Sequence, residues 1–149
     1  MSNVNLAPNY LFEVSWEVCN KVGGIHTVIA SKVPTVKHQM GDKYITIGPD
    51  FSQDAANPCF QEDASLMARW RESLYNKGVR VRIGRWAIDG SPITILIDFK
   101  SFIGQKDDIL KQLWESYHVD SLSGQWDYIE PVLFGHAAGV VIASFVETM

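Results

Sequence analysis

The spacing of hydrophobic residues changes repeatedly along the chain, and this change limits the folds that the sequence can adopt. Strand-forming residues gather at residues 11–16, 44–47, 79–83 and 93–99. Apolar residues recur every three or four positions, the spacing of one helix face, at residues 25–36, 67–74, 109–117 and 129–146. Because strand-like and helix-like segments alternate, the sequence predicts an α/β fold, a sheet with helices packed on it.

Prolines and turn residues mark the ends of several segments. Pro34 should kink or end the first helix, because proline lacks the backbone N–H that a helix interior uses. Residues 50–62 are polar and contain a proline, so we predict a loop there. The turn sequence at residues 89–92 joins two predicted strands, and we expect one antiparallel pair within residues 79–99. Pro131 is expected in the first turn of the last helix, where proline is tolerated.

Length and charge exclude several classes of protein. The chain has 149 residues and a net charge of −4, and 46% of its residues are hydrophobic. This is enough chain for one domain with a real core, and we predict no internal domain boundary. The acidic balance provides no basic stripe for nucleic acid or for a polyanionic membrane surface, so we expect neither as a partner.

Nothing in the sequence indicates export or membrane insertion. The most apolar window, residues 132–146, is shorter than the roughly 20 residues that a membrane span requires. The first ten residues lack the charged and apolar regions of a secretion signal. Cys19 and Cys59 show neither disulfide-framework nor metal-ligand spacing. We therefore expect a cytoplasmic protein with free thiols.

The strongest local candidate for chemistry is the sequence Lys21-Val22-Gly23-Gly24-Ile25, between the first predicted strand and the first predicted helix. Two glycines allow a ligand close to the backbone, the free N–H groups of a helix N-terminus point at an anion, and a lysine adds positive charge. These residues could cradle a diphosphate, or they could form a turn that simply needs glycine. The sequence matches neither GxGxxG nor GxxxxGK[ST].

Other candidates carry weaker signals. Asp50 follows the second predicted strand, where dinucleotide-binding folds often place a ribose-binding acid, although a turn aspartate explains it as well. Gly84-Arg85-Trp86 could stack on a sugar or base, but a buried tryptophan beside a surface arginine is the simpler interpretation. The adjacent Asp107 and Asp108 are typical of a helix start rather than of a glycosidase pair.

The histidines indicate no metal centre. His136 falls on an apolar helix face, which is typical of a core histidine. The remaining three, His26, His38 and His118, have no cysteine or carboxylate at metal-ligand spacing, so we predict no metal site.

A longer pattern of motifs carries a family resemblance. The sequence from Leu11 to Ile25, Leu-Phe-Glu-Val-Ser-Trp-Glu-Val-Cys-Asn-Lys-Val-Gly-Gly-Ile, closely resembles the N-terminus of animal and fungal glycogen synthases. Further agreement comes, in order, from Gly-Asp-Lys-Tyr at 41–44, Ile-Gly-Pro at 47–49, Gly-Arg-Trp-Ala-Ile-Asp-Gly at 84–90, Leu-Trp at 113–114 and Val-Leu-Phe-Gly at 132–135. The resemblance covers nearly all of residues 11–147.

The resemblance implies a retaining glucosyltransferase of the GT-B type, with two Rossmann-like domains facing a cleft. Residues 1–149 would be part of the N-terminal domain, with a mostly parallel sheet, and the C-terminal nucleotide-binding domain would be absent. Lys21, Gly23 and Gly24 would contact the phosphates of UDP. The donor would be UDP-glucose and the acceptor an α-1,4-glucan, with no metal or other cofactor. No catalytic residue is expected in this chain, which alone should be inactive.

The sequence departs from the family pattern at two histidines, and two other functions stay open. His26 stands where the family usually has tyrosine, and His136 where it has an aromatic or apolar residue. A stand-alone Rossmann-type module for another nucleotide, or a non-catalytic domain that binds glucan or docks a partner, would also fit the composition. Self-association through exposed apolar surface is expected if the neighbours of the last helix are missing.

Overall fold

The computed structural model describes residues 9–20, 24–51, 58–99, 102, 107–109, 111, 115 and 126–148. The strands are β1 (Leu11–Val14), β2 (Tyr44–Pro49), β3 (Phe60–Glu62), β4 (Val81–Trp86) and β5 (Ile93–Ile97). The helices are α1 (Gly24–Met40), the 3₁₀ turn η1 (Gly41–Lys43), α2 (Ala68–Asn76) and α4 (Trp126–Thr148). In the predicted helix at 109–117, residues 109, 111 and 115 are helical and the others lie outside the described residues.

The five strands form one sheet in the order β1-β2-β5-β4-β3. β2 is parallel to β1 and to β5, whereas β4 is antiparallel to β5 and to β3. Four of these five strands therefore run in one direction, and β4 runs in the other. This confirms the α/β, Rossmann-like fold with a mostly parallel sheet. The antiparallel pair expected within residues 79–99 is β4 with β5, in which Val81 lies opposite Ile97.

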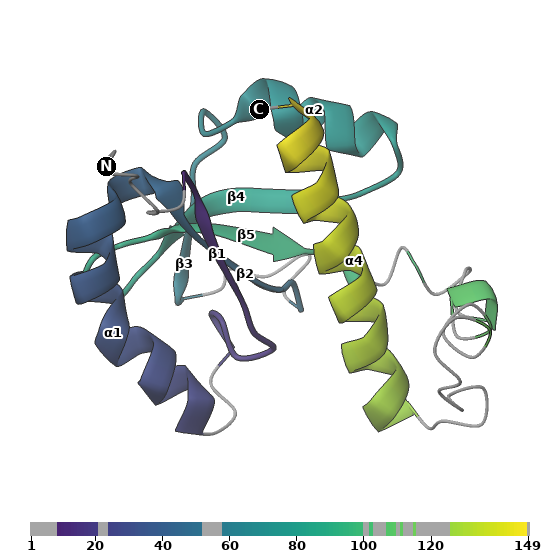
Figure 1. The fold of residues 1–149 in the computed structure, drawn as a ribbon, viewed down its shortest axis with the longest axis horizontal. Coiled ribbons are helices and arrows are strands. Elements are labelled where there is room, and N and C mark those ends of the chain that lie inside the picture. The colour runs from purple at the N-terminus through teal and green to yellow at the C-terminus, as the bar shows by residue number, and fades with distance from the viewer. Residues whose placement is uncertain are drawn as a thin grey trace, which may run out of the picture.

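Helices cover both faces of the sheet. Figure 1 shows α1 on one side, and α2 and α4 on the other. The larger core lies under α2 and α4, and the smaller core lies under α1. Because both faces of β5 are covered, its sequence Ile-Thr-Ile-Leu-Ile is buried throughout instead of alternating between apolar and polar residues. The polar exception, Thr94, shares a hydrogen bond of 2.7 Å with the hydroxyl of Thr46 on β2.

The loop predicted at residues 50–62 is wrong at its end, where β3 forms. β3 has three residues, and its register places Phe60 opposite Trp86 of β4. Phe60 is buried, whereas Gln61 and Glu62 are exposed. A strand this short at the edge of a sheet shows one buried side chain, so no alternation is present in the sequence to detect.

We expected Pro34 to kink or end helix α1; the helix continues through this residue to Met40, so the expected end is wrong. Pro34 is exposed, and the neighbouring Val33 is fully buried against the sheet. Packing of the buried face stabilises the helix despite one lost backbone hydrogen bond. The predicted apolar face is only partly right, because Ile25 and Val28 are 57% and 62% exposed.

Helix α4 is so apolar that spacing alone does not identify its buried face. The sequence predicted a face that includes Leu133 but also Val140, Ala143 and Val146. The buried residues are Leu133, Phe134, Ala137, Ala138, Val141, Ser144 and Phe145, whereas Val146 is 67% exposed. Pro131 is the sixth residue of the helix, so its predicted place in the first turn is also wrong.

The apolar stretch of α4 is longer than the sequence window suggested. By length and composition alone, residues Glu130–Thr148 could cross a membrane. Core helices of soluble proteins meet the same criteria, and here one face of α4 packs against the sheet as part of the larger core.

Candidate functional site

The parallel strands β1, β2 and β5 end at one edge of the sheet, where open α/β folds bind ligands. The sequence-predicted phosphate loop joins β1 to α1 at this edge. Gly24 is the first residue of α1, and apart from its chain neighbours and the adjacent backbone of α1, no described atom lies within 4 Å of the position that a Cβ would occupy. Lys21 and Gly23 lie outside the described residues, so their assignment as phosphate contacts stays a prediction.

The start of α1 is electrostatically suited to an anion. The first turn contains no acidic residue, and the last turn contains Lys37 and His38. In a 17-residue helix the first N–H groups have no intrahelical partner and carry the positive end of the helix dipole. Carboxylates in the first turn would neutralise that charge, and here none does. The helix start can therefore donate hydrogen bonds to a phosphate.

A close backbone contact fixes the turn that leads into this loop. After β1, residues 16–19 form a turn whose Val18 is fully buried. Val18 packs on Gly48 of β2, where a Cβ would lie 2.5 Å from the Val18 carbonyl oxygen and 2.8 Å from its Cβ. Only glycine allows the turn to cross the end of β2 at this distance. The next residue, Cys19, has a φ of 55°, an unusual value for a side chain this buried.

Burial raises the pKa of the Cys19 thiol well above its ordinary range. The nearby Cys59 thiol raises it further, and the Arg82 guanidinium partly offsets both effects. The Cys19 thiol donates to the Cys59 carbonyl oxygen at 3.6 Å. Both cysteines are present as thiols, as the sequence predicts. A thiol held protonated in this way is a poor nucleophile, so Cys19 acts here as a packing residue.

A second set of contacts fixes α1 against the sheet. Glu13 of β1 accepts a hydrogen bond of 2.6 Å from the Tyr44 hydroxyl and forms an ion pair with Lys32 of α1 at 2.5 Å. Burial, followed by the bond to Glu13, raises the pKa of Tyr44, so its hydroxyl stays protonated and remains a donor. Through these two contacts, Glu13 of β1 links this strand to β2 and to α1.

Asp50 is held by an arginine that sequence reasoning missed. Arg82 of β4 donates two hydrogen bonds of 2.7 Å to the two carboxylate oxygens of Asp50, directly after β2. The bond to Asp50 raises the pKa of Arg82. Asp50 is 4% exposed, and its backbone N–H donates to the Ile97 carbonyl at 2.9 Å. The Asp50 side chain is therefore buried and paired with Arg82 at the carboxyl end of the sheet, and it is not available to bind a ribose.

The Gly84-Arg85-Trp86 segment has the structural role that the simpler interpretation gave it. Trp86 is fully buried under α1, and its Nε1 has no hydrogen-bond partner among the described residues. Arg85 donates to Asp42 at 3.1 Å and to the Ser91 carbonyl at 3.0 Å. Burial keeps Trp86 from stacking on a sugar or base, and Arg85 is held by Asp42 and Ser91.

The histidines and acidic residues form no metal centre within the described part of the chain. No three His, Cys, Asp or Glu side chains there could hold an ion together. The His26 ring packs edge-on against Trp86 at 5.5 Å, and the His136 ring packs against Phe102 at 5.5 Å. His38 is exposed, as are Asp107 and Asp108, and His118 lies outside the described residues.

Nearly all of the chain matches one sequence family. Residues 13–149 match the profile of glycogen synthase. The chain belongs to the glycogen synthase family. The matched segment contains the second half of β1, the predicted phosphate loop and every later element, which confirms the family that the sequence motifs indicated.

Individual relatives agree with this assignment. Rat liver glycogen [starch] synthase is 40% identical over 129 residues, 84% of this chain and 18% of the relative. The Neurospora crassa glycogen [starch] synthase is 31% identical over 138 residues, and Saccharomyces cerevisiae isoform 2 is 29% identical over 142. These matches cover 91% and 89% of this chain, and 20% of each relative. The chain thus spans about a fifth of the length of these curated relatives.

Proposed function

We propose that this chain supplies the N-terminal half-site of a retaining glucosyltransferase. The enzyme transfers glucose from UDP-glucose to the 4-hydroxyl at the non-reducing end of an α-1,4-glucan. One observation carries this proposal: in a chain of the glycogen synthase family, α1 begins at a glycine at the carboxyl edge of the sheet, with no acid in its first turn. That arrangement favours a phosphate over a neutral or cationic ligand.

The chemical task of this half-site is to stabilise UDP as it leaves. Negative charge grows on the β-phosphate as the bond to glucose breaks. The N–H groups at the start of α1, with Gly23 and Gly24 and the Lys21 ammonium, would neutralise that charge in a preorganised way. The proposed transfer uses no metal or other cofactor, and we propose that it takes place in the cytoplasm.

Calorimetric titration of UDP into the chain tests this half-site. We expect weak, specific binding that Lys21→Ala reduces by about tenfold or more, which corresponds to about 1.4 kcal/mol. Lys43→Ala is the matched control, because Lys43 is an exposed lysine beyond the other end of α1 and should leave binding unchanged. UDP and UDP-glucose should outcompete NAD and ATP. Equal binding of NAD would instead support a nucleotide module of another kind.

A further inference from the structure

The two cysteines of the chain lie side by side in the fold, although 40 positions separate them in the sequence. The Cys19 thiol donates a hydrogen bond to the carbonyl oxygen of Cys59 at 3.6 Å. Both side chains belong to the smaller core under α1, in which Cys19 is 6% exposed and Cys59 is half-buried at the border. The proposed function uses neither thiol.

The distance between the two residues suits a disulfide. Standard bond lengths place a carbonyl oxygen about 2.4 Å from the Cα of its own residue, so the Cys19 sulfur lies within about 6 Å of the Cys59 Cα. The Cys59 thiol also contributes to the raised pKa of Cys19, an effect that requires the two sulfurs to lie near each other. Rotation of the side chains can therefore bring the sulfurs to the bond length of about 2 Å.

The backbone around both cysteines is fixed by the fold. The Ala87 N–H donates to the same Cys59 carbonyl at 2.8 Å, which attaches Cys59 to the end of β4. Val18 packs on Gly48, which attaches the Cys19 turn to β2. The two thiols are thus held beside each other whenever the chain is folded. Within the described ranges, no further histidine, cysteine or carboxylate completes a metal site with them.

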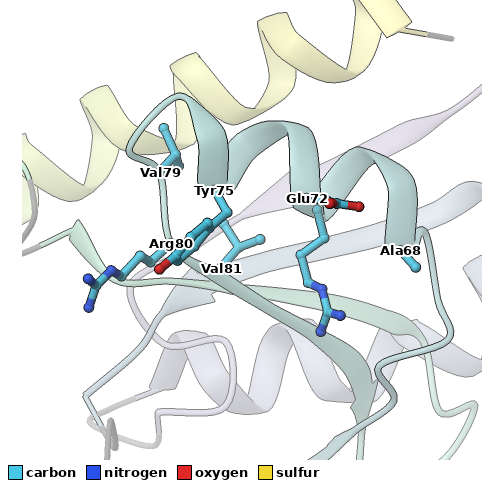
Figure 2. A pocket seen from close by; sticks show the side chains of 7 residues that line it. Ala68, Glu72, Tyr75, Val79, Arg80 and Val81 are labelled. Carbon is cyan, nitrogen blue, oxygen red and sulfur yellow. The ribbon is translucent and has the colours of Figure 1, made fainter.

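The difference in exposure sets the order in which the thiols react. Figure 2 shows a pocket of about 480 Å³ between α2 and the start of β4, which neither thiol lines. A small oxidant therefore reaches Cys59 from solvent, at the border of the core under α1. Cys19 is shielded, and burial raises its pKa and keeps it protonated. Cys59 reacts first, and Cys19 can react only with its neighbour.

We propose that Cys19 and Cys59 form a reversible disulfide by exchange with a small disulfide such as glutathione disulfide. The Cys59 sulfur attacks one sulfur of glutathione disulfide, which forms a mixed disulfide and releases one glutathione. The Cys19 sulfur then attacks the Cys59 sulfur, which closes the protein disulfide and releases the second glutathione. Two protein thiols are oxidised, one glutathione disulfide is reduced, and the two thiol protons end on the two glutathiones.

The second step is favourable despite the burial of Cys19, because it takes place within one folded molecule. The new bond would connect the residue two positions before Lys21 to the residue directly before β3. It would enclose α1 and β2 in a covalent loop, which restricts the unfolded chain and raises the thermal midpoint. In a reducing compartment the bond would form only while the glutathione pool is oxidised.

Mass spectrometry of the folded chain after incubation with glutathione disulfide tests the proposal. The parent should lose two hydrogen atoms, yield a Cys19–Cys59 cross-linked peptide and recover both thiols in dithiothreitol. Cys19→Ser should stop at the mixed disulfide on Cys59, and Cys59→Ser should react about tenfold or more slowly. Oxidation should raise the thermal midpoint of the parent and leave that of Cys19→Ser unchanged. Thermal unfolding of each reduced variant checks that it is folded.

Three outcomes would overturn the proposal. They are a folded parent that keeps both thiols, a parent that stops at the mixed disulfide as Cys19→Ser does, and disulfides that form only between molecules. The same reaction in urea is the control for proximity, because the unfolded chain should accumulate the mixed disulfide. Equally fast closure in urea would also reject the proposal. No UDP is present in these measurements, so their result is independent of the proposed function.

Discussion

At the scale of single residues, Gly48 determines whether the connection after β1 can take its observed path. Gly48→Ala would place a methyl group 2.5 Å from the Val18 carbonyl oxygen, so the turn must move. We expect a loss of about 1 to 3 kcal/mol in the free energy of unfolding, measured by urea denaturation, together with weaker UDP binding. Gly135 is an exposed residue of α4 with open space around it, so Gly135→Ala should instead stabilise the chain by about 0.5 to 1 kcal/mol. Equal changes in the free energy of unfolding for the two variants would contradict the close contact between Val18 and Gly48.

Asp42 gives a pH dependence of known sign. Hydrogen bonds from Arg85 and then Lys37 lower the pKa of Asp42 from 3.8 to about 2. A carboxylate whose pKa is lower in the folded state stabilises that state above its unfolded pKa, and the stabilisation is lost as the pH falls toward 2. Asp42→Asn should therefore cost about 1 kcal/mol or less at pH 6, since Asp42 is exposed, and less at pH 3.

Urea denaturation at the two pH values measures this difference for Asp42→Asn. Asp89→Asn is the control, because the Asp89 carboxylate is exposed and forms no ion pair recorded among the described residues. Its free energy of unfolding should stay near that of the parent at both values. A cost of Asp42→Asn that grows as the pH falls would contradict the assigned ion pairs.

At the scale of secondary structure, the Arg82–Asp50 pair joins the end of β2 to β4 across β5. Arg82→Ala would leave the buried Asp50 carboxylate without its two charged donors, at a cost of about 3 kcal/mol or more. Lys111→Ala removes an exposed i,i+4 pair with Glu115 and should cost about 0.5 kcal/mol or less. Chemical denaturation of both variants checks this, and a cost for Arg82→Ala no larger than for Lys111→Ala would show that the pair is not structural.

The sequence predicted helices and strands best where one face of the element is buried and the other is exposed to solvent. Val79, Val81 and Ile83 alternate with arginines, and β4 follows from that pattern, as α2 follows from the spacing of Trp70 and Leu74. The predictions failed where the hydrophobic pattern does not distinguish a buried face from an exposed one, or where packing outweighs a local signal. α4 is apolar on all sides, β3 is three residues long, and Pro34 is overridden by packing of the residues around it.

Only the part of the candidate site that depends on neighbouring residues in the sequence could be predicted. A glycine pair before a helix is a local signal, so the loop beside Gly24 could be proposed from sequence. The contacts of Arg82 with Asp50 and of Val18 with Gly48 depend on the tertiary fold. The Gly48-Pro49 sequence indicated a strand end, but only the crossing of β2 by the β1–α1 turn explains why glycine is needed there.

At the scale of the whole molecule, the proposed reaction requires a cleft between two domains, of which we propose that this chain supplies one side. Glucosyl transfer needs a closed, water-excluding site, which one domain does not enclose. We expect no incorporation of labelled glucose from UDP-glucose into glycogen by the purified 149-residue chain, at a protein concentration where UDP binding is detected. Measurable incorporation would contradict the proposed division of the active site between two domains.

The exposed edge strand β1 leads us to expect that the chain associates with itself in solution. Within the described region, β1 pairs only with β2, and Leu11 and Val14 are 37% and 41% exposed. An open strand edge pairs readily with another chain. Val14→Lys should therefore reduce concentration-dependent association in analytical ultracentrifugation, whereas Val146→Lys, on the exposed side of α4, should not. The reverse result would assign the association to α4.

The reversed direction of β4 has a consequence for the order of folding. Six residues separate β4 from its antiparallel partner β5, whereas 29 residues separate β1 from β2 and 43 residues separate β2 from β5. Closing a short loop costs less conformational entropy than closing a long one. The antiparallel pair of β4 and β5 should therefore form before the parallel pairs when the chain refolds.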